Sequence, residues 1–247
     1  MSDFDSIGAI ALTGGAAALV ATLVPAAFAK TWARLGAGAL LAIWFGAVVA
    51  GGAVLIFSPS VGLGTPGLGG AVLVPVIGVV ALATFMPRLR HAFDAIPLTT
   101  LIAVNSIRLL GVFFLLLYAA GRLPAPFALS AGWGDIIVGA TAPFVAWLAA
   151  RQAVGWRVAA WLWNGLGILD LFAAVGLGAV TAAGSPVRLI VATPDTGLMT
   201  ALPWIVIPAF VVPLLLLTHV AVLARLLRSG SGSTSRALAG WATRLAD

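Results

Sequence analysis

The chain has 247 residues, of which 62% are hydrophobic and 8% are charged, and it contains no cysteine. A soluble globular domain carries about 25% charged residues, so this chain has too little charge to keep a folded surface in water. The 13 Lys and Arg against 7 acidic residues give a net charge of +6. These cations lie singly between apolar runs, which is typical of membrane topology and excludes a nucleic-acid partner.

The apolar runs predict an all-α integral membrane protein, a bundle of about seven transmembrane helices. A hydrocarbon core about 30 Å thick requires roughly 20 apolar residues per helix, and seven segments meet that requirement. Residues 1–6 contain two Asp and no basic residue, unlike the start of a cleavable signal peptide, so we expect the first span to be retained. The predicted spans are 7–27, 36–57, 69–85, 96–118, 127–150, 158–182 and 201–223.

The cations outside the spans predict the orientation of the bundle. Ten of them fall in the first, third and fifth loops and the tail, against two on the opposite side. Because cytoplasmic loops are enriched in Lys and Arg, we expect the N-terminus outside and the C-terminus in the cytoplasm, in a bacterial inner membrane. The ten are Lys30, Arg34, Arg88, Arg90, Arg151, Arg157, Arg225, Arg228, Arg236 and Arg244, and the two are Arg122 and Arg188.

Residues near the span ends indicate two further features. Trp32, Trp156 and Trp204 are expected to lie at the headgroup level, where an aromatic ring with one N–H is favoured. We divide the chain into a seven-helix transmembrane domain, 1–228, and a cytoplasmic segment, 229–247. That segment combines a flexible Gly/Ser linker with a short amphipathic helix that is expected to lie on the membrane surface. A frayed, disordered end is the alternative.

Three charged residues fall inside predicted spans, where a charge at the helix centre costs about 2.5–3.5 kcal/mol on insertion scales. They are Arg108 in the fourth span, Asp135 in the fifth and Asp170 in the sixth. At about 1.5 Å of rise per residue, all three lie roughly 12–15 Å below the outer ends of their spans. We therefore expect Arg108 to pair with one or both carboxylates. Asn105 lies one turn before Arg108 in the fourth span, and Asn164 lies two turns before Asp170 in the sixth.

The predicted cluster has two interpretations. Two carboxylates around one guanidinium leave one acid in excess, and an acid that carries a proton part of the time is what a proton-coupled site requires. We therefore predict a ligand or proton site at Arg108, Asp135, Asp170, Asn105 and Asn164. The alternative is a buried pair that only fixes helix register.

The sequence shows no motif for a metal or a cofactor, and we expect neither. No zinc-protease, nucleophile-elbow or phosphate-loop motif occurs. A haem between His91 and His219 is conceivable, since both histidines are expected on the cytoplasmic side. Seven spans with an outside N-terminus invite comparison with retinal proteins, which hold retinal on a lysine of the seventh span. The comparison fails because the sole lysine of this chain, Lys30, lies in the first loop.

Three classes of function remain open. A small-solute or proton-coupled transporter is favoured, with membrane lipid and a solute or proton as partners. The alternatives are a membrane-embedded binding or assembly subunit, with other membrane subunits as partners and a purely structural cluster, and a lipid- or quinone-active membrane enzyme. An enzyme is the less favoured of these because no recognisable nucleophile or metal set is present.

Overall fold

The computed structural model describes residues 3–244, and it describes side chains for residues 3–228. Within the described residues the chain is helical and has no strand. Seven helical stretches there are long and apolar enough to cross a membrane, which confirms the predicted number of spans and the all-α class. The membrane orientation stays a prediction.

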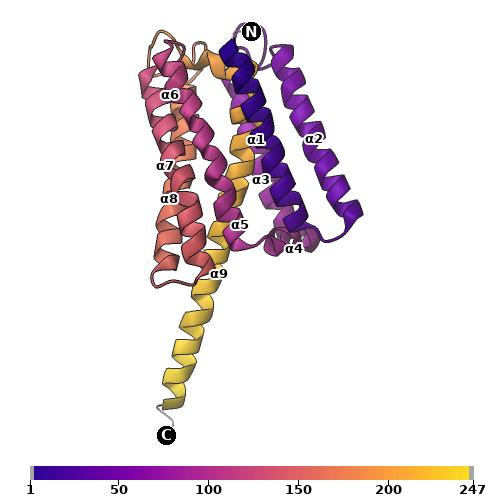
Figure 1. The fold of residues 1–247 in the computed structure, drawn as a ribbon, viewed down its shortest axis with the longest axis vertical. Helices are drawn as coiled ribbons and strands as arrows, with labels where there is room; N and C mark the ends of the chain where they lie inside the picture. The colour runs from indigo at the N-terminus through magenta and orange to yellow at the C-terminus, as the bar shows by residue number, and fades with distance from the viewer. Residues whose placement is uncertain (1–2, 245–247) are drawn as a thin grey trace.

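The spans run up and down the bundle (Figure 1). The fourth is continuous through three segments, and the seventh begins with a π-helical turn. The first three spans are α1 (Asp3–Ala27), α2 (Thr31–Ala53) and α3 (Gly64–Phe85). The fourth is α5 (Leu98–Ala103), the 3-10 helix η1 (Val104–Gly111) and α6 (Val112–Ala119). The others are α7 (Ala125–Ala150), α8 (Trp156–Thr181), and the π-turn η3 (Ile207–Val211) followed by α9 (Val212–Arg244).

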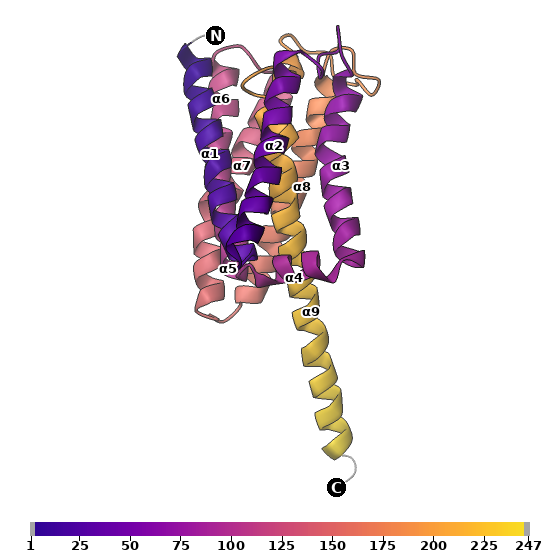
Figure 2. The same cartoon turned by 90° about the vertical axis from the view of Figure 1, so that its right-hand side faces the viewer.

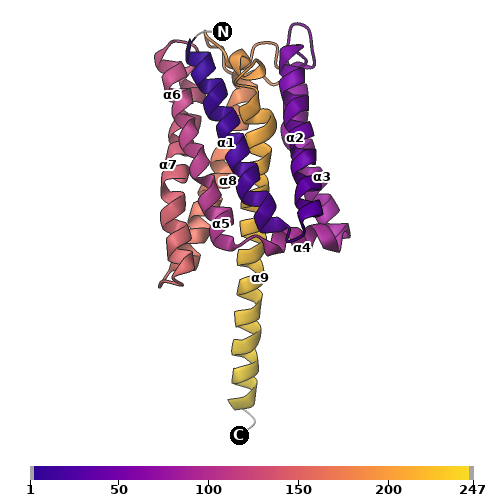
Figure 3. The same ribbon diagram turned by 45° about the vertical axis from the view of Figure 1, so that its right-hand side comes forward.

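The seventh span is the centre of the bundle. It lies between α1–α3 on one side and α5–α8 on the other (Figures 1, 2 and 3). Two-thirds of its apolar window is buried, against 6% for the third span, so the other helices leave most of the α3 surface uncovered. The seventh span begins at Ile207 rather than at 201, because the chain still turns through 201–206. Pro203 lies within this turn and Pro208 follows it, and neither proline has a backbone N–H for a helical hydrogen bond.

Two apolar core clusters are stacked along the bundle. The first joins the halves of the spans nearest the N-terminus of the chain and contains Phe113, Phe127 and Phe210. The second joins the halves nearest α4 and contains Leu101, Val138 and Val222. In each of the spans four to seven, particular polar residues fall between the two clusters: Asn105, Arg108, Asp135, Asn164, Asp170, Thr218 and His219. A buried polar layer therefore separates two apolar layers.

A short helix was missed in the third loop. There α4 (Pro87–Ala95) lies across the end of the bundle, below α1–α3 (Figures 1 and 2). Pro87 suits the first turn of a helix. The guanidinium of Arg225 donates to the carbonyls of Phe93 and Asp94 at 2.8 Å each, satisfying the last turn of α4 and complementing its dipole. Arg228 pairs with the Asp94 carboxylate at 2.6 Å.

The C-terminal segment differs from the prediction in its backbone. α9 runs without a break to Arg244 and projects from the bundle, through the Gly/Ser run that composition predicted to be a flexible linker. Extending an existing helix needs no new nucleus, which gives the physical reason. The amphipathic face predicted for 236–246 lies outside the residues whose side chains are described.

Candidate functional site

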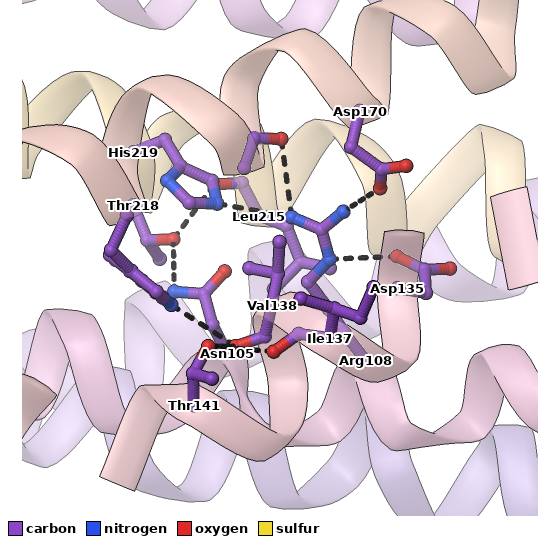
Figure 4. A network of polar contacts seen from close by, with 12 residues as sticks. Asn105, Arg108, Asp135, Ile137, Val138, Thr141, Asp170, Leu215, Thr218 and His219 are labelled. Carbon is purple, nitrogen blue, oxygen red and sulfur yellow. Dashed lines mark hydrogen bonds and ion pairs between the residues drawn. The ribbon is translucent and has the colours of Figure 1, made fainter. Parts of the chain in front are cut away.

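Arg108 is the centre of the polar layer, and its side chain is 0% exposed. Its Nε donates to Asp135 Oδ1 of α7 at 2.7 Å, and its Nη2 pairs with Asp170 Oδ2 of α8. Its Nη1 donates to the Gly167 carbonyl at 3.2 Å and lies 3.3 Å from His219 Nε2 of α9. One guanidinium therefore joins four spans (Figure 4).

The 3-10 segment η1 explains how the fourth span presents this face. In a 3-10 helix, side chains three residues apart are eclipsed, whereas in an α-helix they are offset. Asn105, Arg108 and Gly111 follow this spacing and are the buried residues of η1. The local winding thus aligns the amide, the guanidinium and a glycine along one line facing α7, α8 and α9.

Glycines make room for the charged side chains. A Cβ at Gly111 would collide with Asp135 and one at Gly134 would collide with the Asp170 carboxylate, while a Cβ at Gly139 would lie 2.8 Å from the Leu109 nitrogen beside Arg108. A Cβ at Gly167 would collide with the imidazole of His219. Small residues allow helix backbones in a membrane to approach closely, and here they do so where the ion pairs cross.

His219 is a member of the cluster that the sequence interpretation missed. It is fully buried, and its Nδ1 lies 2.8 Å from Asn164 Oδ1. Arginine has no acceptor, so Nε2 accepts from Arg108, and Nδ1 must then carry the hydrogen that is donated to Asn164. His219 is therefore the neutral Nδ1–H tautomer. Both ring nitrogens are engaged, so His219 is not available to ligate a haem opposite His91.

The expectation that His219 lies near the cytoplasmic end was wrong. It lies about 18 Å along the span from Ile207, at 1.5 Å of rise per residue, which is the depth of Arg108. From the predicted start at 201 the same arithmetic gives about 27 Å, so the late start of the seventh span is the reason that His219 was not grouped with Arg108.

Asn105 extends the layer beside Arg108. Its Nδ2 donates to the Leu101 carbonyl at 2.8 Å and to Thr218 Oγ1 at 3.1 Å. Thr218, next to His219, in turn donates to the Leu215 carbonyl at 2.7 Å. Among the described side chains, Asn105 Oδ1 and Asn164 Nδ2 are buried polar atoms without a hydrogen-bond partner, so each amide keeps one unused polar atom within the layer.

The structure thus brings together the five residues singled out in the sequence. Arg108 contacts Asp135 and Asp170 directly, as the depth arithmetic predicted, whereas Asn164 reaches it through His219 and Asn105 is its neighbour on η1. The carboxylate side chains are 15% and 13% exposed, so they are the accessible part of the cluster. Their role in binding a ligand or proton stays a prediction.

A second ion pair lies at the outer end of the bundle. Asp5 Oδ1 accepts from Arg122 Nη1 at 2.8 Å and from Trp204 Nε1 at 3.0 Å. Trp204 is 0% exposed and packs between Phe4 and Phe113. It lies beside the first turn of α1, near the end of the bundle, but it contacts protein, so its interpretation as a membrane anchor is corrected. Its N–H is bound by a buried carboxylate, and the turn at 201–206 carries it into the core. Trp32 is exposed.

No group of three or more His, Cys, Asp or Glu that could hold a metal ion occurs among the described residues. In the polar layer two carboxylates and an imidazole do converge, but on the Arg108 guanidinium. The arrangement can hold or exchange a proton or a cation through its carboxylates.

The described residues form an all-helical bundle with a buried Arg–Asp–His layer, and the length and composition of its seven apolar helices are those of a multi-pass membrane protein. Residues 65–227 match the model of a domain family of unknown function, DUF8737, and the chain belongs to that family. The matched region includes every member of the polar layer. No curated protein and no solved structure matches the chain.

Proposed function

We propose that the protein is a transporter, proton-coupled or specific for a small cationic solute, with Arg108, Asp135 and Asp170 as its coupling site. The observation that carries the proposal is the presence of two carboxylates on one fully buried guanidinium. The proposed location is a bacterial inner membrane, with the N-terminus outside.

The charge of the cluster favours a proton or a cation. Arg108 contributes one positive charge, the two aspartates contribute two negative charges when ionised, and His219 is neutral as Arg108's acceptor. One negative charge is then in excess between two apolar layers, where an uncompensated charge costs several kcal/mol. Binding one proton or one monovalent cation removes it. An anionic solute would add to the excess and is disfavoured.

The geometry also supports exchange. The carboxylates are partly exposed while the guanidinium is not, so a proton that enters the layer would meet a carboxylate before it meets Arg108. The cluster also lies on a 3-10 segment within an otherwise α-helical span, a feature that often marks a functional hinge. Protonation of one aspartate would weaken its ion pair with Arg108 of η1. The contact between η1 and the helix that carries this aspartate, α7 or α8, would then be weaker.

The test is solute-coupled proton entry into proteoliposomes that contain a pH-sensitive dye. The vesicles are loaded with one member of a panel of organic cations, amino acids and sugars, and an inward proton gradient is imposed. Because the site binds either one proton or one cation, we expect an internal cation to accelerate proton entry by exchange, and we expect D135N and D170N to abolish the acceleration. The control is S106A, because Ser106 lies on η1 but donates to the Ala103 carbonyl rather than to the cluster. If no solute accelerates proton entry, or if both Asn variants match S106A, the proposal is wrong.

A second candidate is an assembly subunit in which the cluster is structural. Arg108 already makes contacts to four groups of the chain itself, and a solute would have to displace one of them. On this alternative the Asn variants would change stability and the recovery of membrane partners without any effect on proton entry.

A further inference from the structure

An apolar cavity of about 440 Å³ lies between α1, α2, α3, α4 and α9, in the half of the bundle nearest α4. Thr218 is the one polar residue among those that line it. Leu23, Leu40, Trp44, Val79 and Leu217 are representative lining residues. The lining residues on α2 run from Ala37 to Trp44, a rise of about 10 Å at 1.5 Å per residue. The cavity therefore spans about two-thirds of one leaflet of a bilayer core about 30 Å thick.

A second cavity, of about 310 Å³, adjoins the first at its α4 end. The two share Ala27, Phe28 and Ala92 as lining residues. The second is lined in addition by Lys30, Arg88 and His91. The apolar cavity thus continues into a basic one at the end of the bundle where α4 crosses (Figure 2).

The charges of the basic cavity have no acidic partner among the described side chains. Asp94 is the carboxylate of α4, and it pairs with Arg228 of α9. Arg225 and Arg228 are thereby engaged in holding α4, whereas Lys30 and Arg88 are in no ion pair of the described residues. The first turns of α2 and α4 lie beside Lys30 and Arg88, without side-chain caps, and they add positive potential.

We propose that the two cavities form a binding site for one anionic phospholipid. Its phosphate is held by Lys30, Arg88 and His91, and an acyl chain occupies the apolar cavity. Basic pockets beside membrane helices bind anionic headgroups, with about 1 kcal/mol per Lys or Arg near the surface. A free phosphate would satisfy the cations but leave the apolar cavity without a ligand, and a zwitterionic lipid would leave the cations uncompensated. The proposal does not rest on the function proposed for the Arg108 cluster.

The test is native mass spectrometry of the full chain, released from micelles that contain equal amounts of phosphatidylglycerol and phosphatidylcholine. We expect one retained phosphatidylglycerol per protein. The double variant K30Q/R88Q should weaken its retention by about tenfold or more, since two cations are lost. The control is R151Q/R157Q, which removes the same charge at the same end of the bundle, in the loop between α7 and α8 and at the start of α8.

A second pair of variants tests the acyl chain. Ala37 lines the apolar cavity and Ala39 does not, and both lie on α2. A37F should fill the cavity and lower retention, while A39F should leave it unchanged. Inorganic phosphate in tenfold excess over the lipid should not displace it. Equal retention of the two lipids, equal retention by K30Q/R88Q and its control, or displacement by phosphate would each overturn the proposal.

Discussion

Arg108 and Asp135 form an ion pair of 2.7 Å between η1 and α7, with the guanidinium fully buried and the carboxylate partly exposed. Asp170 binds the same guanidinium from α8. The guanidinium is fully buried and the two carboxylates are partly exposed. We therefore expect substitution of Arg108 to lower the stability of the protein more than substitution of either aspartate.

Replacing Arg108 with Leu should destabilise the protein more than any other single change in the cluster. It leaves two carboxylates without a counter-charge, and breaking a buried pair in this way costs about 3–5 kcal/mol. The measurement is the melting temperature in detergent. The triple variant R108L/D135N/D170N should recover part of the loss, because it removes the stranded acids. A triple variant no more stable than R108L would contradict the electrostatic explanation.

D135N and D170N should each remain folded, because one carboxylate still compensates Arg108. The excess negative charge is then gone, so the cluster should lose its proton-binding step. Infrared difference spectra between pH 5 and 9 should show a carboxylic-acid carbonyl band in the parent and in S106A that is absent from both Asn variants. A band that persists unchanged in both variants would assign proton binding elsewhere.

Gly167 and Gly165 offer a matched pair on α8. A Cβ at Gly167 collides with the imidazole of His219, while a Cβ at Gly165 meets nothing within 4 Å. G167A should therefore cost about 1–3 kcal/mol through overpacking. G165A should be neutral or stabilising, since alanine is favoured over glycine in a helix by about 1 kcal/mol. Equal melting temperatures of the two variants would show that α8 and α9 can separate at this point without cost.

His219→Phe should destabilise the protein by about 1–3 kcal/mol. The change removes the donor to Asn164 Oδ1, and one buried polar atom left unsatisfied costs this amount, whereas Arg108 Nη1 still donates to the Gly167 carbonyl. S106A is the control, because Ser106 donates to the Ala103 carbonyl and not to the cluster. Nitrogen NMR of the parent should show the neutral Nδ1–H form of His219 at pH 7. A doubly protonated ring would refute the assigned tautomer.

The predicted topology can be tested with single cysteines, since the chain contains none of its own. Ser60, in the loop after α2, and Val154, in the loop after α7, are both exposed and lie at opposite ends of the bundle. In intact cells a membrane-impermeant thiol reagent should label S60C, and it should label V154C only after the membrane is opened. The reverse pattern would invert the orientation.

The sequence by itself determined the class of fold and most of the spans. Apolar length is a local property, because each span needs about 20 residues to cross the hydrocarbon. The cost of a buried charge is also local, so Arg108, Asp135 and Asp170 could be singled out, and helical rise placed them at one depth. The α4 helix and the late start of the seventh span were missed because single turns and prolines give weak local signals.

Only the tertiary structure decided which residues complete the site and which do not. Depth along a helix does not give the direction in which a side chain faces. The sequence therefore could not show that Asn164 reaches Arg108 through His219, which was predicted to lie nearer the cytoplasmic side. For the same reason it could not show that Trp204 is buried. The 3-10 winding of η1 and the close approach at Gly134 and Gly167 depend on packing between spans. The two cavities beside α4 likewise arise only when five helices that are distant in sequence come together.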